Sequence, residues 1–174
     1  MAPAPDEQPL WRCPACGQRF VTRNMPHSCQ VVALDEHFAG ADPALRAVFD
    51  ALLEAARASG PVGVNATKTR VTFQARMRFA GIDRPRRDHL LANFVLTRPV
   101  RSERLRRVEH VSPYYYVHRL PLRRVEDVDD EVRGWLAEAY QVGRQRHVDD
   151  PDWPREREPP DWVSRPGPAA APRA

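Results

Sequence analysis

The three cysteines of this 174-residue chain stand in one short stretch, WRCPACGQRFVTRNMPHSC, with a histidine shortly before the last of them. Cys13 and Cys16 form a Cys-x-x-Cys turn followed by glycine, and His27 and Cys29 end the stretch. Thiolates and imidazole are the ligands of closed, tetrahedral zinc sites. The pattern therefore predicts a structural Zn²⁺ centre in residues 11–30, a segment too short to hold an apolar core of its own.

Two other interpretations of the cysteines remain open. A redox dithiol opens a helix after a strand, but here a proline lies between the cysteines and no strand pattern precedes them. Cysteines without a shared role are the third interpretation. The fourth zinc ligand is also open, because only Ser28 separates His27 from Cys29 and His37 is a rival. We favour His27.

A catalytic constellation is not evident elsewhere in the sequence. The remaining candidates for acid or base chemistry are His89, His110, His118 and Lys68. They fit no Ser-His-Asp order, no phosphate loop and no His-Glu-x-x-His motif. His110 and His118 stand on neighbouring predicted strands, where ordinary packed histidines are the simpler interpretation. We therefore name no catalytic residue and favour a protein that is not an enzyme.

Positive charge is concentrated between residues 68 and 107, where twelve basic residues stand against three acidic ones in a chain of net charge +4. Lys68 is the only lysine. Such an excess attracts polyanions, and guanidinium groups beside aromatic rings are typical of surfaces for single-stranded nucleic acid. Arginines that merely solvate the surface, with tyrosines in the core, are an equal alternative. The candidate polyanion-binding residues are Lys68, Arg70, Arg76, Arg78, Arg86, Arg87 and Tyr115.

Both ends of the chain have the composition of disordered segments. Residues 1–10 are rich in proline, and residues 149–174 combine seven prolines with alternating charge. Trp153 and Trp162 in the second segment could dock a protein partner. No run of about 18 apolar residues and no secretory signal is present, which predicts a cytoplasmic protein without a membrane span.

Two helices are predicted from apolar periodicity. The first opens with Asp42 and Pro43, carries an apolar stripe that includes Phe49, and stops at Gly60. The second begins near Asp127, has Trp135 on its apolar stripe, and extends through residues 144–147, whose basic side chains suit a helix C-terminus.

The middle of the chain predicts strands. Residues 70–82 alternate apolar and polar side chains, with Arg70, Thr72, Gln74, Arg76 and Arg78 on the outer face. The pattern fits either one long strand or two strands joined by a tight turn near Arg76. Residues 89–96 and 114–122 predict two more strands, and residues 104–111 a weaker one. Strands with helices before and after them indicate an α+β domain, with an antiparallel sheet backed by helices on one face.

The stretches GPVGVNATKTRVTFQARMRFAGIDRP and HRLPLRRVEDVDDEVRGWLAEAYQVG resemble the bacterial domain-of-unknown-function 5655 family, over about residues 38–145. The resemblance implies a hairpin break near Arg76, which would place Arg70, Thr72 and Gln74 on one strand and Arg78 on the next. It implies no activity.

The sequence thus predicts four segments: residues 1–10, a zinc knuckle at 11–30, an α+β domain at 31–148 and a tail at 149–174. The expected function is that of a small bacterial zinc-binding protein with a nucleic-acid or polyanion binding surface. An accessory, protein-interaction or small-ligand domain without catalysis is the alternative.

Overall fold

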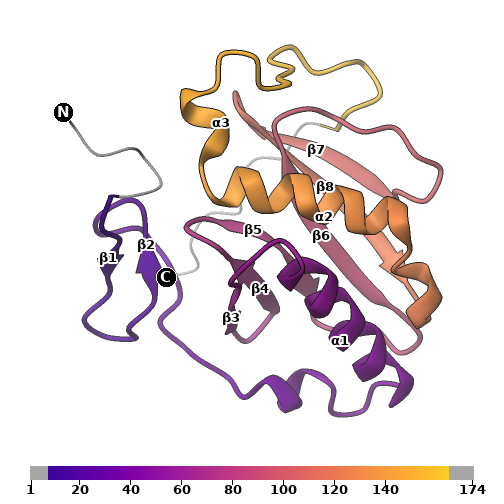
Figure 1. The fold of residues 1–174 in the computed structure, drawn as a ribbon. Helices are drawn as coiled ribbons and strands as arrows, with labels where there is room; N and C mark the ends of the chain where they lie inside the picture. The colour runs from indigo at the N-terminus through magenta and orange to yellow at the C-terminus, as the bar shows by residue number, and fades with distance from the viewer. Residues whose placement is uncertain (1–7, 165–174) are drawn as a thin grey trace.

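An antiparallel six-stranded sheet with helices on one face forms the body of the protein (Figure 1). The computed structural model describes residues 8–164. Its strand order is β3-β4-β5-β6-β8-β7, and the predicted α+β class is confirmed. The strands are β3 (Gly63–Ala66), β4 (Arg70–Gln74), β5 (Arg78–Asp83), β6 (Leu90–Leu96), β7 (Arg107–Ser112) and β8 (Tyr115–Leu122).

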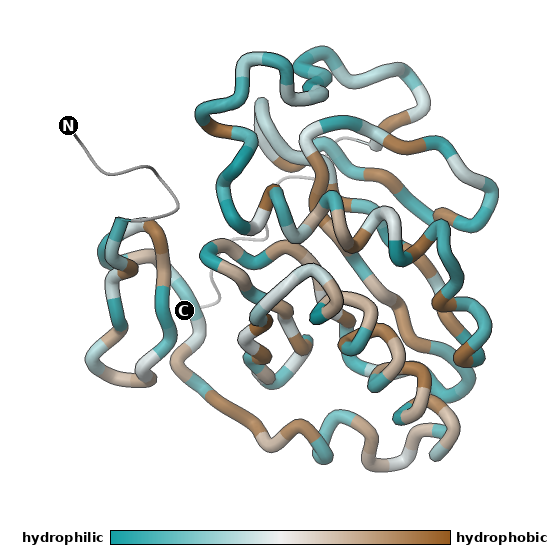
Figure 2. The backbone as a smooth tube through the Cα atoms, viewed as in Figure 1, coloured by the Kyte–Doolittle hydropathy of each residue, from teal (hydrophilic) through white to brown (hydrophobic). Residues whose placement is uncertain are grey.

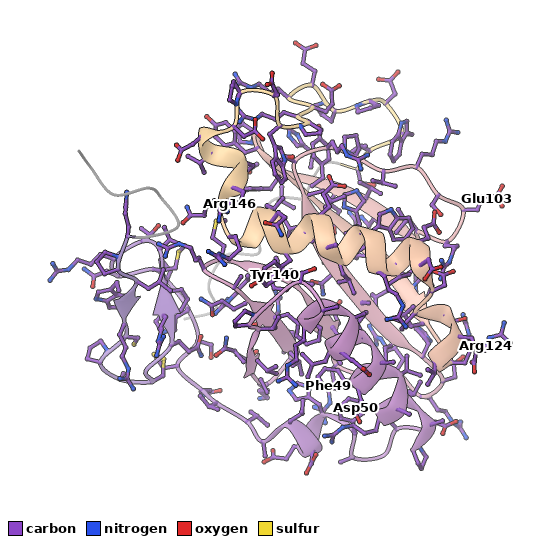
Figure 3. All side chains as sticks on the ribbon, viewed as in Figure 1. Phe49, Asp50, Glu103, Arg124, Tyr140 and Arg146 are labelled. Atoms are coloured by element: carbon purple, nitrogen blue, oxygen red, sulfur yellow. The ribbon has the colours of Figure 1, made fainter. Side chains whose placement is uncertain are left out.

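Helices α1 (Ala44–Arg57) and α2 (Asp130–Gly143) cover one face of this sheet (Figure 1). In α1, Phe49 is fully buried while its neighbour Asp50 is exposed and pairs with Arg46 one turn earlier (Figure 3). This alternation is what the apolar stripe predicts. The shorter elements are η1 (Leu34–His37), η2 (Val125–Asp127) and α3 (Arg146–Asp149).

The second predicted helix differs from the structure at both ends. It begins after Asp129, whose carboxylate accepts a hydrogen bond from the Val132 amide, while the sequence predicted a start near Asp127. It ends at Gly143, because Gln145 adopts a left-handed conformation with φ 65°. Basic residues 146 and 147 therefore lie on the separate α3, and the prediction of one continuous helix was wrong.

The break between β4 and β5 falls at residues 75–77, as the family resemblance implied. The turn is held by the end of α2, since the Gly143 carbonyl accepts hydrogen bonds from the amides of Arg76 and Met77 at 3.1 and 2.8 Å. Gly143 also has no room for a side chain, because a Cβ there would lie 2.9 Å from the Cβ of Phe79.

The core lies between the sheet and the two long helices. Trp135 of α2 stacks on Phe94 of β6 with ring centroids 5.2 Å apart, and the His118 ring stacks on Phe94 at 4.7 Å. Phe49 of α1 meets Phe73 of β4 at 5.8 Å. Figure 2 shows the resulting pattern, with hydrophobic and hydrophilic residues alternating along the strands beneath α2.

The sequence predicted disorder from residue 149 onward, but residues 150–164 lie against the body. The indole N–H of Trp153 donates to the Thr97 hydroxyl at 2.8 Å, and Tyr116 donates its hydroxyl to the Glu156 carbonyl at 2.9 Å. Ser164 pairs with β7 through backbone hydrogen bonds. Trp153 thus fixes a segment whose composition alone suggested disorder.

Other parts of the predicted ends, residues 1–7 and 165–174, lie outside the described residues. Within residues 8–164, no helix is long and apolar enough to cross a membrane.

Candidate functional site

A small hairpin beside the sheet, here called the head (residues 11–30), carries the cysteines (Figure 1). Strands β1 (Trp11–Arg12) and β2 (Arg19–Phe20) pair in antiparallel fashion. Between them the Gly17 amide donates to the Cys13 carbonyl at 2.9 Å, and the Cys13 amide donates to the Gln18 carbonyl at 2.8 Å. Gly17 has φ 73°, a conformation that side-chain-bearing residues rarely adopt. The turn therefore aims both cysteines of the pair to one side.

Four donor atoms converge at this turn. The ligand atoms of Cys13, Cys16, His27 and Cys29 all lie within 4.8 Å of one another. His27 Nε2 is 3.2 Å from the Cys16 sulfur and 3.4 Å from the Cys29 sulfur, and the sulfurs of Cys13 and Cys29 are 3.8 Å apart. These four side chains could bind a metal ion.

The ring of His27 is oriented for coordination. Its Nδ1 lies 2.6 Å from the Met25 carbonyl, which accepts a hydrogen bond from that nitrogen and leaves Nε2 directed at the sulfurs. The Phe20 ring packs against the imidazole with centroids 4.4 Å apart. A backbone acceptor on the far nitrogen of a histidine is the usual partner of a metal-ligating imidazole.

The protonation of the cluster also suits a cation. A hydrogen bond from the Cys16 amide lowers the pKa of the Cys13 thiol to about 6. Burial, followed by the neighbouring sulfurs of Cys13 and Cys16, raises the pKa of Cys29 to about 11. The Met25 carbonyl raises the pKa of His27. A positive ion among the sulfurs would offset their mutual repulsion and hold all three as thiolates.

The rival ligand, His37, lies apart from this group. It ends η1, only 3% of its surface is exposed, and neither ring nitrogen has a hydrogen-bond partner within residues 8–164. The sequence offered no sign of this burial, because a histidine in a polar four-residue turn usually lies at the surface.

The head covers part of the sheet face that was predicted to be open. Gln74 donates its amide to the Arg19 carbonyl, and Arg78 donates to the Gln18 side chain at 3.0 Å while lying over the Phe20 ring. Gln74 is consequently buried, and Thr72 is buried too, with its hydroxyl donating to the Asn65 carbonyl of β3 at 3.3 Å. The expectation that these two side chains face solvent was wrong, since polar contacts between segments far apart in sequence leave no periodic signal.

Two of the candidate arginines are engaged beneath or beside the head. Arg76 donates to the Gln8 carbonyl at 2.6 Å and to the Gln145 side chain at 3.2 Å. Burial, followed by the nearby charge of Arg70, lowers the pKa of Arg78.

The other basic candidates gather at one end of the sheet. Antiparallel pairing brings the β3–β4 turn and the β5–β6 loop to the same end, where the Arg84 amide donates to the Thr69 carbonyl at 2.9 Å. All five basic side chains there are exposed. This group, here called the basic end, consists of Lys68, Arg70, Arg84, Arg86 and Arg87.

Tyr115 is separated from the basic end by the length of the sheet. It begins β8, where its hydroxyl lies 3.0 Å from His147 Nε2 and 3.9 Å from the Met77 sulfur in the β4–β5 turn. The structure therefore does not bring Tyr115 together with residues 84–87.

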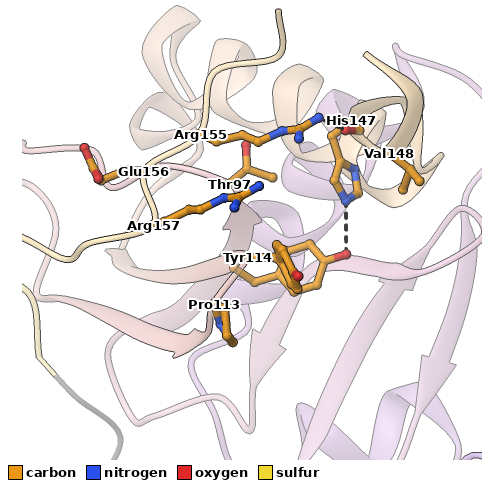
Figure 4. A pocket seen from close by; sticks show the side chains of 9 residues that line it. Thr97, Pro113, Tyr114, His147, Val148, Arg155, Glu156 and Arg157 are labelled. Carbon is orange, nitrogen blue, oxygen red and sulfur yellow. Dashed lines mark hydrogen bonds between the residues drawn. The ribbon is translucent and has the colours of Figure 1, made fainter. Parts of the chain in front are cut away.

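Beside Tyr115 lies a cavity of about 290 Å³ between β8, α3 and the segment after α3 (Figure 4). The dashed line in Figure 4 marks the hydrogen bond between His147 and the Tyr115 hydroxyl, and the Arg155 side chain reaches to His147. Arg155 donates to two backbone carbonyls, those of His147 and Asp150. Burial lowers the pKa of His147, and the charge of Arg155 adds to the effect.

The remaining histidines form no catalytic cluster within the described residues. His110 stacks on Tyr116 and His118 on Phe94, and the strand register places Val108, not His110, opposite His118. His118 Nε2 accepts a hydrogen bond from the Val100 amide at 3.0 Å. Burial lowers the pKa of His118 to about 4, which keeps the ring neutral.

Comparison with known proteins gives one match. The family model described as "Domain of unknown function (DUF5655)" matches residues 34–143, which include the sheet and both long helices but not the head. The chain belongs to this family. No curated protein and no solved structure matches the chain.

Proposed function

We propose that this member of the DUF5655 family is a zinc-stabilised module that binds single-stranded nucleic acid through phosphate contacts at the basic end. One observation carries the binding part of the proposal: five cationic side chains gather at one end of the sheet, and none of them has an ion pair within the described residues. The metal part rests on the four donor atoms of the head.

Zinc is the ion that the donor set favours. In a tetrahedral site with Zn–S bonds of about 2.3 Å, two sulfurs lie about 3.8 Å apart. The sulfurs of Cys13 and Cys29 are separated by 3.8 Å. Four protein ligands leave no open position, so the ion would hold the head together without taking part in a reaction.

Two of the acids near the basic end, Asp83 and Asp88, are engaged by other groups. Asp83 pairs with Arg119 at 2.8 Å, and Asp88 lies 2.8 Å from the His89 ring and 3.9 Å from Arg123. The positive charge of the end is therefore left for an external anion. Guanidinium groups on a loop reach neighbouring phosphates of a flexible strand, which suits single-stranded nucleic acid.

Fluorescence anisotropy with a labelled single-stranded oligonucleotide at several salt concentrations tests this proposal. If about four cations contact phosphates, log K should fall against log[salt] with a slope of roughly −2.8. Arg86→Gln together with Arg87→Gln should flatten the slope to about −1.4, because two phosphate contacts are lost.

The matched control is Arg57→Gln with Arg133→Gln, which removes two exposed charges on α1 and α2. That variant should keep the slope of the unchanged protein. Absence of binding at low salt, or equal losses in both double variants, would exclude a phosphate-binding role for the basic end.

The cavity of Figure 4 supports a second candidate function, the binding of a small apolar acid. Its walls combine the Tyr114 and Tyr115 rings with Arg157, which has no ion pair within the described residues. His147 is 6% exposed and its Nδ1 lacks a partner there.

A thermal-shift screen of aromatic carboxylates tests this second function. Arg157→Gln should abolish any stabilisation by a hit, whereas the exposed Arg133→Gln should leave it intact. A screen without hits removes this candidate and does not affect the first.

A further inference from the structure

His37, which the head does not use, shares a pocket with the only lysine of the chain. The pocket has a volume of about 200 Å³ and is lined by Val32, Glu36, His37, Lys68 and Arg84. A water molecule occupies about 30 Å³ of liquid, so this space admits a group of several heavy atoms. It is separate from both the metal ligands and the cavity of Figure 4.

Three hydrogen-bonded segments build the pocket. The Val32 amide donates to the Ala66 carbonyl at 3.1 Å, which ties the segment after the head to β3. The Thr67 amide donates to the Arg70 carbonyl at 2.9 Å and closes the turn that carries Lys68. The bond from the Arg84 amide to Thr69 then fixes the third segment. The backbone thus holds the side chains of residues 37, 68 and 84 around one space.

The buried imidazole calls for a partner. Only 3% of the His37 surface is exposed, and neither ring nitrogen forms a hydrogen bond within residues 8–164. An imidazole carries at least one N–H donor in either protonation state, and leaving a buried donor unpaired is unfavourable. Both ring nitrogens are closed to solvent in this orientation, so a ligand oxygen in the pocket would satisfy the donor once the ring turns one nitrogen toward it.

The charged side chains around the pocket favour an anionic ligand. Lys68 and Arg84 have no hydrogen bond or ion pair from their side chains within the described part of the chain. Glu36 is the one carboxylate in the lining, so two cations stand against one anion. A phosphate group, which carries about −1.5 to −2 charges at pH 7, matches two cations and an N–H donor.

We propose that this pocket binds the phosphate group of a phosphate monoester, with Lys68 and Arg84 as charged donors and His37 as the buried donor. The group belongs either to a small free monoester or to the phosphorylated end of a nucleic-acid strand. The second source rests on the proposed function of the basic end. Lys68 supplies a compact ammonium at a site where the chain otherwise uses arginine.

Titration with inorganic phosphate, followed by NMR of the histidine side chains, tests the pocket directly. The His37 signals should shift saturably. Lys68→Gln and Arg84→Gln should each weaken binding about tenfold, the loss of one charge-assisted hydrogen bond. Glu36→Gln should tighten binding, because it removes the opposing charge. Arg133→Gln, an exposed change on α2, should have no effect.

An unshifted His37 signal at saturating phosphate overturns the proposal, as does equal binding by the Lys68→Gln variant. The first of these measurements uses the protein without substitutions, so it does not depend on whether a variant folds. Oligonucleotides with and without a 5′-phosphate then separate the two sources. Preference for the phosphorylated strand, lost in Lys68→Gln, supports the strand end. Equal affinity with the His37 shift retained supports a free monoester.

The two proposals also fail separately. A protein that binds phosphate at His37 but no oligonucleotide overturns the proposed function and leaves the pocket supported. A protein that binds oligonucleotides but whose His37 signals do not respond to saturating inorganic phosphate overturns the pocket alone.

Discussion

The head buries two hydrophobic side chains, Cys13 and Phe20, whereas the body buries a large connected cluster that extends from Leu45 on α1 to Tyr140 on α2, and a smaller one around Tyr116. Cys13 is itself one of the metal-ligand candidates. Apolar burial therefore stabilises the body, while the head lacks enough of it and, on the proposed function, depends on metal–ligand bonds and on its contacts with the sheet. A segment of about 20 residues buries too little apolar surface to be stable by that means alone, whereas a full domain buries enough.

The largest effect should follow from removing the metal. Cys13→Ser should abolish binding of about one metal ion per chain, since structural zinc contributes about 10–16 kcal/mol of apparent binding energy in small domains. Metal analysis and hydrogen exchange should show residues 11–30 losing metal and protection together, with the body still folded. Ser28→Ala, a change between two ligands, is the control and should keep the metal. Loss of the body in the Cys13→Ser protein would contradict the division into two regions.

The second-largest effect should come from truncating a core side chain of the body. Trp135→Ala should lower the free energy of unfolding by about 3–5 kcal/mol, as other large aromatic truncations do. Chemical denaturation gives this value, and the metal content should not change. Trp162, which is 41% exposed, provides the control: Trp162→Ala should leave the free energy of unfolding nearly unchanged. Similar losses in both variants would place Trp135 outside the core.

Acid should destabilise the body through His118. Its pKa lies near 4 in the folded protein, below the ordinary value of 6.5. Above pH 6.5 the His118 ring is neutral in both the folded and the unfolded protein. Between pH 6.5 and 4 the ring takes up a proton only in the unfolded protein, so the free energy of unfolding decreases as the pH is lowered. The loss should reach about 3 kcal/mol and level off below pH 4.

Denaturation in the Cys13→Ser background separates this effect from acid release of the metal. The His118→Gln variant should show a shallower decline over the same pH range. His147, whose pKa burial also lowers, adds a decline of the same sign to both proteins. Identical slopes with and without His118 would rule out the assigned role.

The smallest expected effect concerns the contact between the two regions. Gln74→Ala removes hydrogen bonds to the carbonyls of Arg19 and Arg76 and should weaken docking of the head by about 1 kcal/mol. The measurement is the difference in body stability with and without metal, which should shrink. Thr69→Ala, an exposed change at the opposite end of β4, should not alter that difference.

Local patterns predicted much of this molecule. The Cys-x-x-Cys turn and the apolar stripe of α1 each depend on residues close in sequence, and each has its counterpart in the structure. The alternation of residues 70–74 predicted the strand β4 but not its burial, because Thr72 and Gln74 are buried as well. The β4–β5 break at Arg76 came from the family resemblance, because an alternating pattern alone does not distinguish one long strand from a hairpin.

Long-range polar contacts account for what sequence could not predict. The bond from Trp153 to Thr97 and the bond from Gln74 to Arg19 join residues 56 and 55 positions apart. Neither residue pair stands out by type or period. The pocket at His37 likewise needs three separate segments, and the break at Gln145 follows from a turn that occupies the carbonyl of Gly143.

The β4–β5 turn contacts both regions. The Gly143 carbonyl of α2 accepts hydrogen bonds from two amides of the turn, and the Gln8 carbonyl beside the head accepts one from the Arg76 side chain. If metal binding to the head stabilises this turn, the gain in free energy is a coupling free energy between the two sites. Such coupling is reciprocal. The folded body must then raise the metal affinity of the head by the same factor. An excised peptide of residues 8–30 should therefore bind the ion more weakly than the whole chain, and the ratio of the two affinities measures that coupling.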